Sequence, residues 1–244
     1  FREQSHLKLK LQDNAPQDEE DHYIEGYFCS HKNEKTFLQV RSNPVFIDGK
    51  QAFLIVMYDI SELKAVEERM TYMAYHDTLT GLPNRPHLVE RLENELARAR
   101  RHKYFGAVLF VDLDYFKAIN DSLGHPVGDE LLRQVAKRLN LCVRTEDMVS
   151  RLSGDEFVVV LTVLDSDFDT ACLSAAEVAE KIRVSISEPY QHEDMNLHIS
   201  CSIGVKIYSD EDTSGEELLR FADTAMYQVK NHGRNAVEFF NEEM

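Results

Sequence analysis

The sequence is short of positive charge. Its 244 residues include 27 lysines and arginines against 43 aspartates and glutamates, and the formal net charge is −16. Because a nucleic-acid partner needs a basic surface to neutralise its phosphates, this balance argues against DNA or RNA binding. Any phosphate chemistry must therefore depend on a few local cations and on a bound metal ion.

Paired cysteines and long apolar segments are also missing. The four cysteines are scattered without a CxxC pair, which argues against a disulfide framework or a zinc site and is typical of a reducing compartment. No apolar run approaches the roughly 18 residues of a membrane span, and no signal peptide is visible. We expect a cytoplasmic domain. Because the chain begins at Phe1 and not at Met, a fragment with a membrane anchor or sensor upstream stays open as an alternative.

The sequence does contain enough apolar material, 43% of residues, for one sizeable domain and a smaller piece. Strands joined partly by hairpins and partly by helices predict an α+β fold, with a mixed sheet flanked by helices. The predicted helices are 85–101, 127–141, 168–187 and 215–231, with a short one from Tyr115, and the predicted strands are 105–112, 148–152, 156–163, 197–207 and 236–240.

Two adjacent acids stand at the turn of the hairpin formed by 148–152 and 156–163. Ser153 and Gly154 suit a tight turn between strands. No turn requires Asp155 and Glu156, whose charges repel each other at the start of an apolar strand. A bound cation would explain this pair.

A second acidic site follows the apolar strand 105–112, which leads into Asp112-Leu113-Asp114. Alternate strand residues share a face, so both aspartates are expected to point the same way. Two strand ends with carboxylates supply hard oxygen ligands for Mg²⁺, and two such ions can clamp the oxygens of a phosphoryl transfer. The alternative is that both acidic pairs only cap strand ends in water.

Several separated motifs, in order, resemble the GGDEF family of diguanylate cyclases from about Thr71 to Phe240. They are the segments 76–85 (HDTLTGLPNR), 112–121 (DLDYFKAIND), 124–129 (GHPVGD), 153–157 (SGDEF) and 222–227 (ADTAMY), followed by Lys230 and 233–235 (GRN). The resemblance implies a palm-like sheet, as in adenylyl cyclases, and condensation of two GTP molecules to cyclic di-GMP with release of pyrophosphate.

The resemblance also assigns roles to residues of this chain. Mg²⁺ or Mn²⁺ would bind Asp112, Asp155 and the backbone carbonyl of Leu113, and Glu156 would complete the acidic site. The Ser153-Gly154 turn would let the backbone approach the nucleotide. The phosphates would be held by Lys117, Lys230 and Arg234, with Lys117 also counted among the catalytic residues.

Two polar residues look like guanine readers. Asp129 could accept hydrogen bonds from the guanine N1–H and amino group, and Asn120 could donate to a ring nitrogen or O6, whereas adenine would leave both unpaired. On local grounds Asn120 could instead end a helix, and Asp129 could be a first-turn acid.

Arg144 and Asp147 resemble the RxxD inhibitory product site, with Lys181 or Arg183 as an additional contact; the plain alternative is an i,i+3 salt bridge.

Three further details of the resemblance matter. The family usually has glycine where this chain has Ser153, and a positive φ there would strain a serine. Asp77 and Arg85 are expected to form an ion pair that closes the opening turn. The end of the chain, 239–244, resembles the exit toward an EAL phosphodiesterase domain, so we expect a fragment of a longer PAS-GGDEF-EAL protein.

Residues 1–60 resemble the C-terminal part of a PAS sensor domain. Strands are predicted at Tyr23–His31, Thr36–Phe46 and Ala52–Tyr58, the last two joined at Asp48-Gly49, and Asp59-Ile60-Ser61 opens a helix. An unrelated β-meander is the alternative.

The helix over 61–75 has an apolar seam. Its members, Leu63, Val66, Met70 and Met73, are spaced three, four and three residues apart, like the a and d positions of a coiled coil. We expect a parallel homodimer stalk, which leaves 76–244 as the GGDEF domain; the alternative is a helix that lies on its own domain.

Three functions follow from these residues. The first is a Mg²⁺-dependent diguanylate cyclase that acts as a dimer and is inhibited by its product. The second is a module that binds GTP or cyclic di-GMP and regulates a neighbouring EAL domain without turnover. The third, a cyclase that uses ATP, is disfavoured by Asn120 and Asp129.

Overall fold

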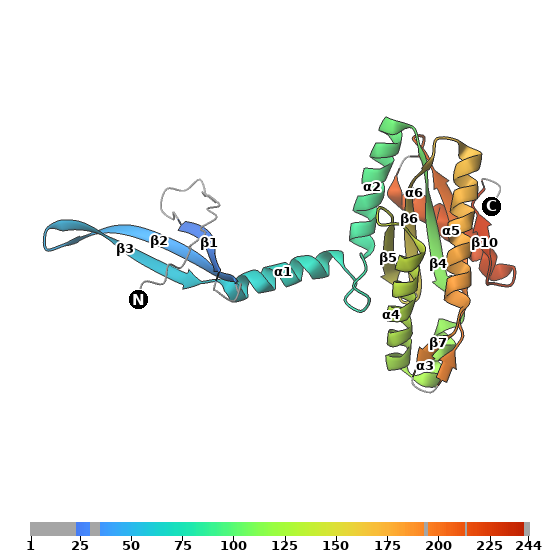
Figure 1. The fold of residues 1–244 in the computed structure, drawn as a ribbon, viewed down its shortest axis with the longest axis horizontal. Coiled ribbons are helices and arrows are strands. Elements are labelled where there is room, and N and C mark those ends of the chain that lie inside the picture. The colour runs from blue at the N-terminus through green and yellow to red at the C-terminus, as the bar shows by residue number, and fades with distance from the viewer. Residues whose placement is uncertain (1–22, 30–34, 193–194, 213, 242–244) are drawn as a thin grey trace. The chain divides into compact units, whose positions relative to one another are not determined.

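The computed structural model describes residues 23–29, 35–192, 195–212 and 214–241 (Figure 1). The chain divides into two compact units, Phe1–Tyr72 and Met73–Met244. Within the described residues, no helix is long and apolar enough to cross a membrane. Cys142, Cys172 and Cys201 are free thiols.

The first unit is a three-stranded antiparallel sheet followed by a helix. The strands are β1 (Tyr23–Cys29), β2 (Lys35–Ile47) and β3 (Lys50–Asp59), in the order β1-β2-β3, and the helix is α1 (Ser61–Tyr75). The predicted turn at Asp48-Gly49 is present, with φ angles of 49° and 72°. The predicted strand end at residues 30 and 31 lies outside the described residues.

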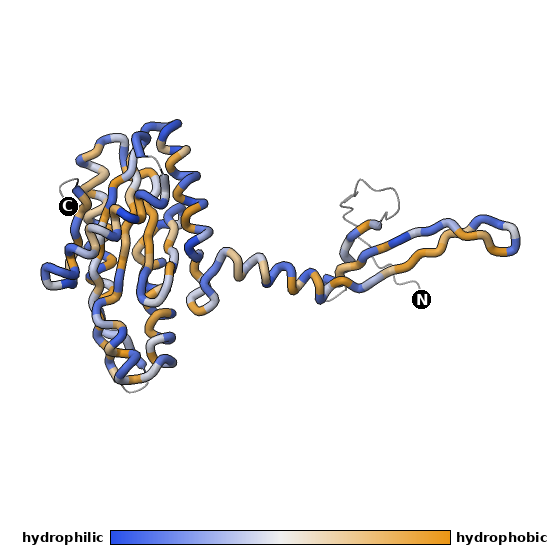
Figure 2. Tube along the Cα trace, turned by 180° about the vertical axis from the view of Figure 1, so that it is seen from behind, coloured by the Kyte–Doolittle hydropathy of each residue, from blue (hydrophilic) through white to orange (hydrophobic). Residues whose placement is uncertain are grey.

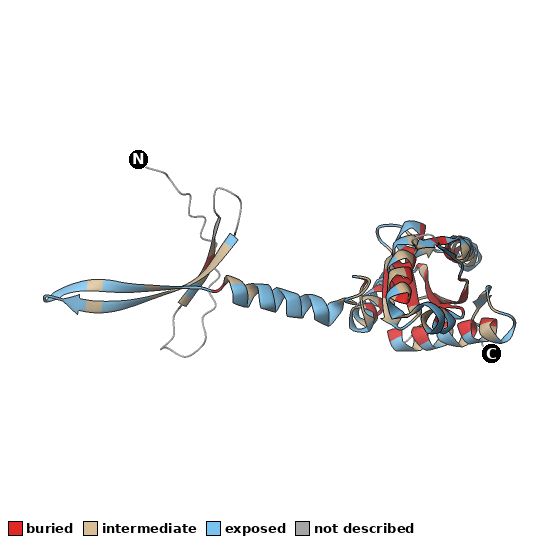
Figure 3. Cartoon of the chain, turned by 90° about the horizontal axis from the view of Figure 1, so that it is seen from below, coloured by how far each residue is buried: buried red, intermediate tan, exposed pale blue. Residues whose placement is uncertain are grey.

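One face of this first sheet is apolar and exposed. Strand register places Phe53, Ile55 and Met57 of β3 on the same face as Val40 and Pro44 of β2. The β3 side chains of this set are 58–65% exposed, and the run of apolar residues is visible along β3 in Figure 2. No residue of α1 is buried either (Figure 3).

The second unit is built on a five-stranded mixed sheet with the order β10-β9-β4-β6-β5. Its strands are β4 (Phe105–Leu113), β5 (Met148–Ser153), β6 (Glu156–Asp165), β9 (Cys201–Tyr208) and β10 (Val237–Phe239). Neighbours are antiparallel except β10 and β9, which are parallel. The α+β prediction is confirmed.

Helices cover both faces of the second sheet. The helices are α2 (Arg85–His102), α3 (Phe116–Leu123), α4 (His125–Cys142), α5 (Phe168–Ser187) and α6 (Gly215–Asn231). Leu109 and Val159 belong to a core cluster with α4 and α5, whereas Val108, Phe110 and Val158 belong to a cluster with α2 and α6. The alternation along β4 and β6 therefore separates two cores.

A glycine lets α6 approach the sheet closely. A Cβ at Gly204 of β9 would lie 2.0 Å from the carbonyl oxygen of Ala222 and 2.2 Å from the amide nitrogen of Met226. Only a residue without a side chain fits between strand and helix backbone at this point. This contact fixes the height of α6 above β9, and with it the position of the side chains near the end of the helix.

One predicted strand is divided. The sequence predicts a strand over 197–207, but the structure has a short hairpin, β7 (Tyr190–His192) with β8 (Met195–Leu197), and then a break before β9 begins at Cys201. Ser200, in the break, donates its hydroxyl to the Asp114 carboxylate 2.6 Å away. A tertiary contact thus replaces strand pairing there.

Candidate active site

The two predicted acidic sites meet where β4 and β6 lie side by side. Asp112 pairs in register with Glu156, and both lie on the sheet face that carries Phe110 and Val158, under α2 and α6. The amide of Leu113 donates to the carbonyl oxygen of Asp155 at 3.3 Å, which joins the strand end to the hairpin turn. The structure therefore brings Asp112, Leu113, Asp155 and Glu156 together.

Asp112 is a buried acid beside a lysine. Its side chain is 7% exposed, and Lys230 Nζ lies 2.8 Å from its Oδ2. Burial raises the pKa of Asp112 to about 6; the bond from Lys230 opposes this rise, and the charges of Asp155 and Glu156 add to it. Desolvation and like charge outweigh a single ion pair here, as expected for carboxylates that share one site.

The hairpin turn accepts serine without backbone strain. Gly154 has the positive φ, 47°, and Ser153 is absent from the described non-glycine residues with positive φ. The condition for strain at Ser153 is therefore not met, because the left-handed position of the turn falls one residue later, at Gly154. Ser153 donates its hydroxyl to Glu156 Oε2 at 2.7 Å.

The donor set fits a magnesium ion carried by a nucleotide. No group of three or more His, Cys, Asp and Glu side chains suited to a metal occurs in the described part of the chain. Mg²⁺ commonly binds proteins through only one or two carboxylates and completes its shell with water and substrate phosphates. Asp112 is paired with Lys230, but the charges of Asp155 and Glu156 still add to the rise that burial causes in its pKa. These oxygens therefore suit Mg²⁺ or Mn²⁺ together with phosphate.

Asp114, the other acid of the strand end, is fully engaged in hydrogen bonds. Its side chain is buried and accepts from the hydroxyls of Ser200 and Ser202 at 2.6 and 2.7 Å and from the amide of Asn235 at 3.1 Å. A buried carboxylate with three donors is a structural anchor. It ties the end of β4 to β9 and to the turn after α6.

The three predicted phosphate ligands come from two elements and one turn. Lys117 lies exposed in the first turn of α3, Lys230 in the last turn of α6, and Arg234 in the following turn. The guanidinium carbon of Arg234 lies 4.8 Å from the centre of the Tyr115 ring. Lys230 already pairs with Asp112.

The predicted guanine readers lie where α3 meets α4. The Asn120 Oδ1 atom is buried and has no hydrogen-bond partner within the described residues. It lies so close to Gly128 that a Cβ there would be 1.9 Å away, and half-buried Asp129 follows Gly128 in the chain. The alternative that Asn120 ends a helix concerns only its backbone, because the Gly124 N–H donates to the Asn120 carbonyl oxygen near the end of α3. The side-chain oxygen, a hydrogen-bond acceptor, is the atom of Asn120 that is left without a partner within the described residues.

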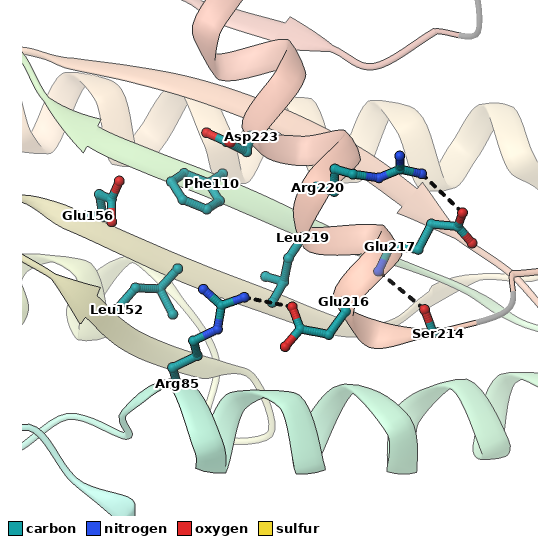
Figure 4. A pocket seen from close by; sticks show the side chains of 10 residues that line it. All are labelled: Arg85, Phe110, Leu152, Glu156, Ser214, Glu216, Glu217, Leu219, Arg220 and Asp223. Atoms are coloured by element: carbon teal, nitrogen blue, oxygen red, sulfur yellow. Dashed lines mark hydrogen bonds and ion pairs between the residues drawn. The ribbon is translucent and has the colours of Figure 1, made fainter.

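A cleft of 630 Å³ opens beside Glu156, between α2, α6 and the sheet (Figure 4). Two of its arginines are paired with its acids, Arg85 with Glu216 at 2.7 Å and Arg220 with Glu217 at 3.1 Å. Burial and the charge of Glu156 raise the pKa of Asp223 on the same wall. Acidic side chains therefore continue along this cleft from Glu156 toward the start of α6.

The predicted product-site residues line a separate cavity of 280 Å³ between the end of α4, β6 and α5. Arg144 is exposed, and Asp147 accepts from the amides of Arg144 and Thr162 at 3.0 Å each. No salt bridge joins Arg144 to Asp147 in the described set. Lys181 lines the same cavity, whereas Arg183 bonds Glu180 and Asn235 elsewhere.

The predicted pair of Asp77 and Arg85 is wrong. Asp77 Oδ1 accepts from Arg151 Nη1 at 2.9 Å and from Thr80, while Arg85 pairs with Glu216. Arg151 also donates to the carbonyl oxygen of Gly154, at 2.7 Å from Nη2. Sequence reasoning overlooked Arg151, which braces the acidic hairpin turn against the segment before α2. Its position directly before the turn was the available signal.

The geometry agrees with the comparisons. Residues 74–236 match the family described as "Diguanylate cyclase, GGDEF domain". The chain belongs to the GGDEF family of diguanylate cyclases. All site residues discussed above fall within the matched range, and the resemblance drawn from the motifs is confirmed.

Two curated relatives illustrate the match. The bifunctional diguanylate cyclase/cyclic di-GMP phosphodiesterase MucR of Pseudomonas aeruginosa is 42% identical over 184 residues, which cover 75% of this chain and 26% of MucR. The response regulator PleD of Caulobacter vibrioides is 40% identical over 168 residues, 68% of this chain and 36% of PleD. The chain spans about a quarter of the length of the first relatives that it matches.

Solved structures share the GGDEF fold. The GGDEF domain of TpbB from Pseudomonas aeruginosa superposes with a TM-score of 0.62 at 37% identity and covers 66% of this chain and 98% of that one. The coiled coil and GGDEF domain of DgcB from Caulobacter crescentus, in complex with c-di-GMP, gives 0.65 at 27% identity, over 74% of this chain and 93% of that one.

Proposed function

We propose that this domain condenses two GTP molecules to cyclic di-GMP with release of two pyrophosphates. In each half-reaction a 3′-hydroxyl oxygen forms a bond to the α-phosphorus of the other nucleotide, and the bond from that phosphorus to pyrophosphate breaks. The observation that carries the proposal is that Asp112 and Glu156 lie on one sheet face, that the charge of Asp155 acts on Asp112, and that Lys230 of α6 pairs with Asp112. Phosphoryl-type transfer asks mainly for such positioning and charge neutralisation.

The proposal gives the residues of the site separate roles in binding metal and phosphate. Asp112, Asp155 and the Leu113 carbonyl would hold Mg²⁺, which when bound neutralises phosphate charge and orients the reacting oxygens. Glu156, restrained by Ser153, completes the acidic wall. Lys117, Lys230 and Arg234 bind phosphate oxygens, and the Ser153-Gly154 turn leaves the backbone free to approach the nucleotide.

Guanine is selected between α3 and α4. In this proposal the NH2 group of the Asn120 amide is the donor and the half-buried Asp129 carboxylate is the acceptor that match the guanine edge, and the unpartnered Asn120 Oδ1 atom adds a further acceptor. ATP would leave these groups unpaired, so we expect GTP to bind more tightly by at least tenfold.

The test is incubation with GTP and Mg²⁺, with the nucleotides separated by chromatography. Cyclic di-GMP and pyrophosphate are expected, and the variant Asp155→Ala/Glu156→Ala should form neither. Product formation that survives this double change would overturn the site assignment. Thermal melting of the variant serves as the control for folding.

Product inhibition is expected at the second cavity. Exposed Arg144 and Lys181 offer cationic donors, and Asp147 offers a carboxylate acceptor, to a guanine of cyclic di-GMP. Arg144→Ala should raise the product concentration for half inhibition at least tenfold and leave the initial rate unchanged. Equal inhibition of both proteins would contradict this role.

The assembly is proposed to be a homodimer joined through α1, because each GTP half-site needs the other. The seam residues Leu63, Val66, Met70 and Met73 are 47–66% exposed. Residues 1–60 are proposed to be a PAS-derived input, 61–75 the signalling helix and 76–244 the GGDEF domain.

A second candidate is a regulatory module that binds GTP or cyclic di-GMP and controls a following EAL domain. MucR, which shares 42% identity, is named for both cyclase and phosphodiesterase activities. Binding of GTP without turnover, by a dimeric sample free of product, would favour this candidate.

A further inference from the structure

Tyr115 has a backbone conformation that an aromatic residue seldom adopts. Its φ is +59°, it precedes α3 without capping the helix through its side chain, and it is 68% exposed. A bulky residue with positive φ is a true outlier, and such strain collects at ligand sites. Neither burial nor helix capping explains why a large ring is held there.

The ring faces a second turn with the same kind of strain. Arg234 and Asn235 have φ angles of +65° and +48°, and the Arg234 guanidinium carbon lies 4.8 Å from the centre of the Tyr115 ring. These two turns are far apart in the sequence, since the neighbouring Asp114 and Asn235 are separated by 121 positions. Their meeting is a feature of the fold and not of local sequence.

Asp114 holds the two turns together. Its carboxylate accepts from the amide of Asn235 at 3.1 Å, and its own amide donates to the Ser200 carbonyl at 2.8 Å. Tyr115 follows Asp114 directly, and Arg234 precedes Asn235. The buried acid thus fixes the backbone on both sides of the stacked pair.

We propose that Tyr115 is a positioning residue that holds the Arg234 guanidinium ready for the nucleotide phosphates. Stacking occupies the face of the guanidinium and leaves its N–H edge free, and this edge binds phosphate in a bidentate way. Lys230 pairs with Asp112, so Arg234 is the phosphate ligand whose direction is set by an aromatic ring. The inference rests on the proposed function, because GTP supplies the phosphates.

The test compares Tyr115→Ala with Tyr115→Phe. Both are titrated with Mg²⁺-GTP by calorimetry and assayed for turnover, with melting curves to confirm folding. A cation–π contact at an exposed site corresponds to a two- to fivefold change in affinity. The alanine variant should therefore show Kd and KM raised about two- to fivefold with kcat unchanged, and the phenylalanine variant should recover the original values. Leu173→Ala, at an exposed residue of α5, is the matched control.

The possible outcomes separate the two proposals. An unchanged Kd in Tyr115→Ala, or a phenylalanine variant as weak as the alanine variant, overturns the positioning role while turnover stands. GTP binding that Tyr115→Ala weakens, without formation of cyclic di-GMP by the natural sequence, contradicts the proposed function alone. A natural sequence that binds no GTP overturns both.

Discussion

At the scale of single residues, the acidic site around Asp112 lowers the stability of the folded domain. Asp112 is buried next to two other acids, and burial together with their charges raises its pKa to about 6. A carboxyl whose pKa is higher in the folded state than in the unfolded state favours folding while it is protonated. That contribution is complete at low pH and is lost as the pH rises through the folded pKa.

This sign gives the first prediction. Asp112→Asn should raise the melting temperature of the metal-free domain at pH 8, where Asp112 is charged, and should change it little at pH 5, where it is largely protonated. Lys230 loses its partner but is 29% exposed and stays hydrated. Turnover should fall at least a hundredfold at both pH values, since a proposed metal ligand is lost. Equal shifts in melting temperature at pH 5 and pH 8 would rule out the raised pKa.

The sequence indicated two acidic pairs that the fold brings together, but it did not indicate the partners of the residues around them. The acids at the ends of 105–112 and in the 153–157 turn are local patterns, and the fold places them together. The pairing of Asp77 with Arg151 joins residues 74 positions apart, and the contact of Tyr115 with Arg234 joins the segment after β4 to the turn after α6. Such contacts form only when the sheet has packed, so no local sequence pattern predicts them.

At the scale of elements, helices with strong caps were predicted most accurately. The helix over 168–187 begins after Asp167 and the helix over 215–231 after Ser214, and each cap side chain accepts from an amide three residues on. The strand predicted over 197–207 was wrong at its start, because Ser200 bonds the distant Asp114 and the chain leaves the sheet. Tertiary contacts override an apolar run in this case.

The second prediction concerns the contact between β9 and α6. Gly204→Ala would place a methyl group 2.0 Å from the Ala222 carbonyl, so α6 must move away from the sheet. We expect a loss of about 1–3 kcal/mol in the free energy of unfolding, measured with denaturant. Because Lys230 and Arg234 move with the end of α6, GTP affinity should fall in protein that is still folded. Unchanged affinity would show that the phosphate ligands do not depend on this contact.

At the scale of the whole molecule, the first turn of α1 is fastened to the first sheet. The Phe37 amide donates to Ser61 Oγ at 2.9 Å, and Lys64 pairs with Glu25 at 3.0 Å. A displacement of β1 or β2 would therefore move the first turn of α1. The exposed seam further along the helix is the surface on which a second copy would sense it.

The third prediction tests that seam. Val66→Asp with Met70→Asp places charges at two positions of the proposed dimer interface, and both residues are exposed in the single chain. We expect a shift from dimer to monomer by analytical ultracentrifugation and at least a tenfold loss of turnover, because the half-sites separate. Arg69→Ala, on the polar side of the helix, should preserve both. A monomeric variant with full turnover would refute the need for two copies.

Because Lys230 and Asp112 form an ion pair, a ligand that binds at either residue would have to replace the other. The ammonium group and the carboxylate lie 2.8 Å apart and neutralise each other. Under the proposed function, a cation bound at Asp112 would displace Lys230, and a phosphate bound at Lys230 would displace Asp112. A magnesium–nucleotide complex would replace both halves of the pair at once, so metal and nucleotide would bind cooperatively through this ion pair.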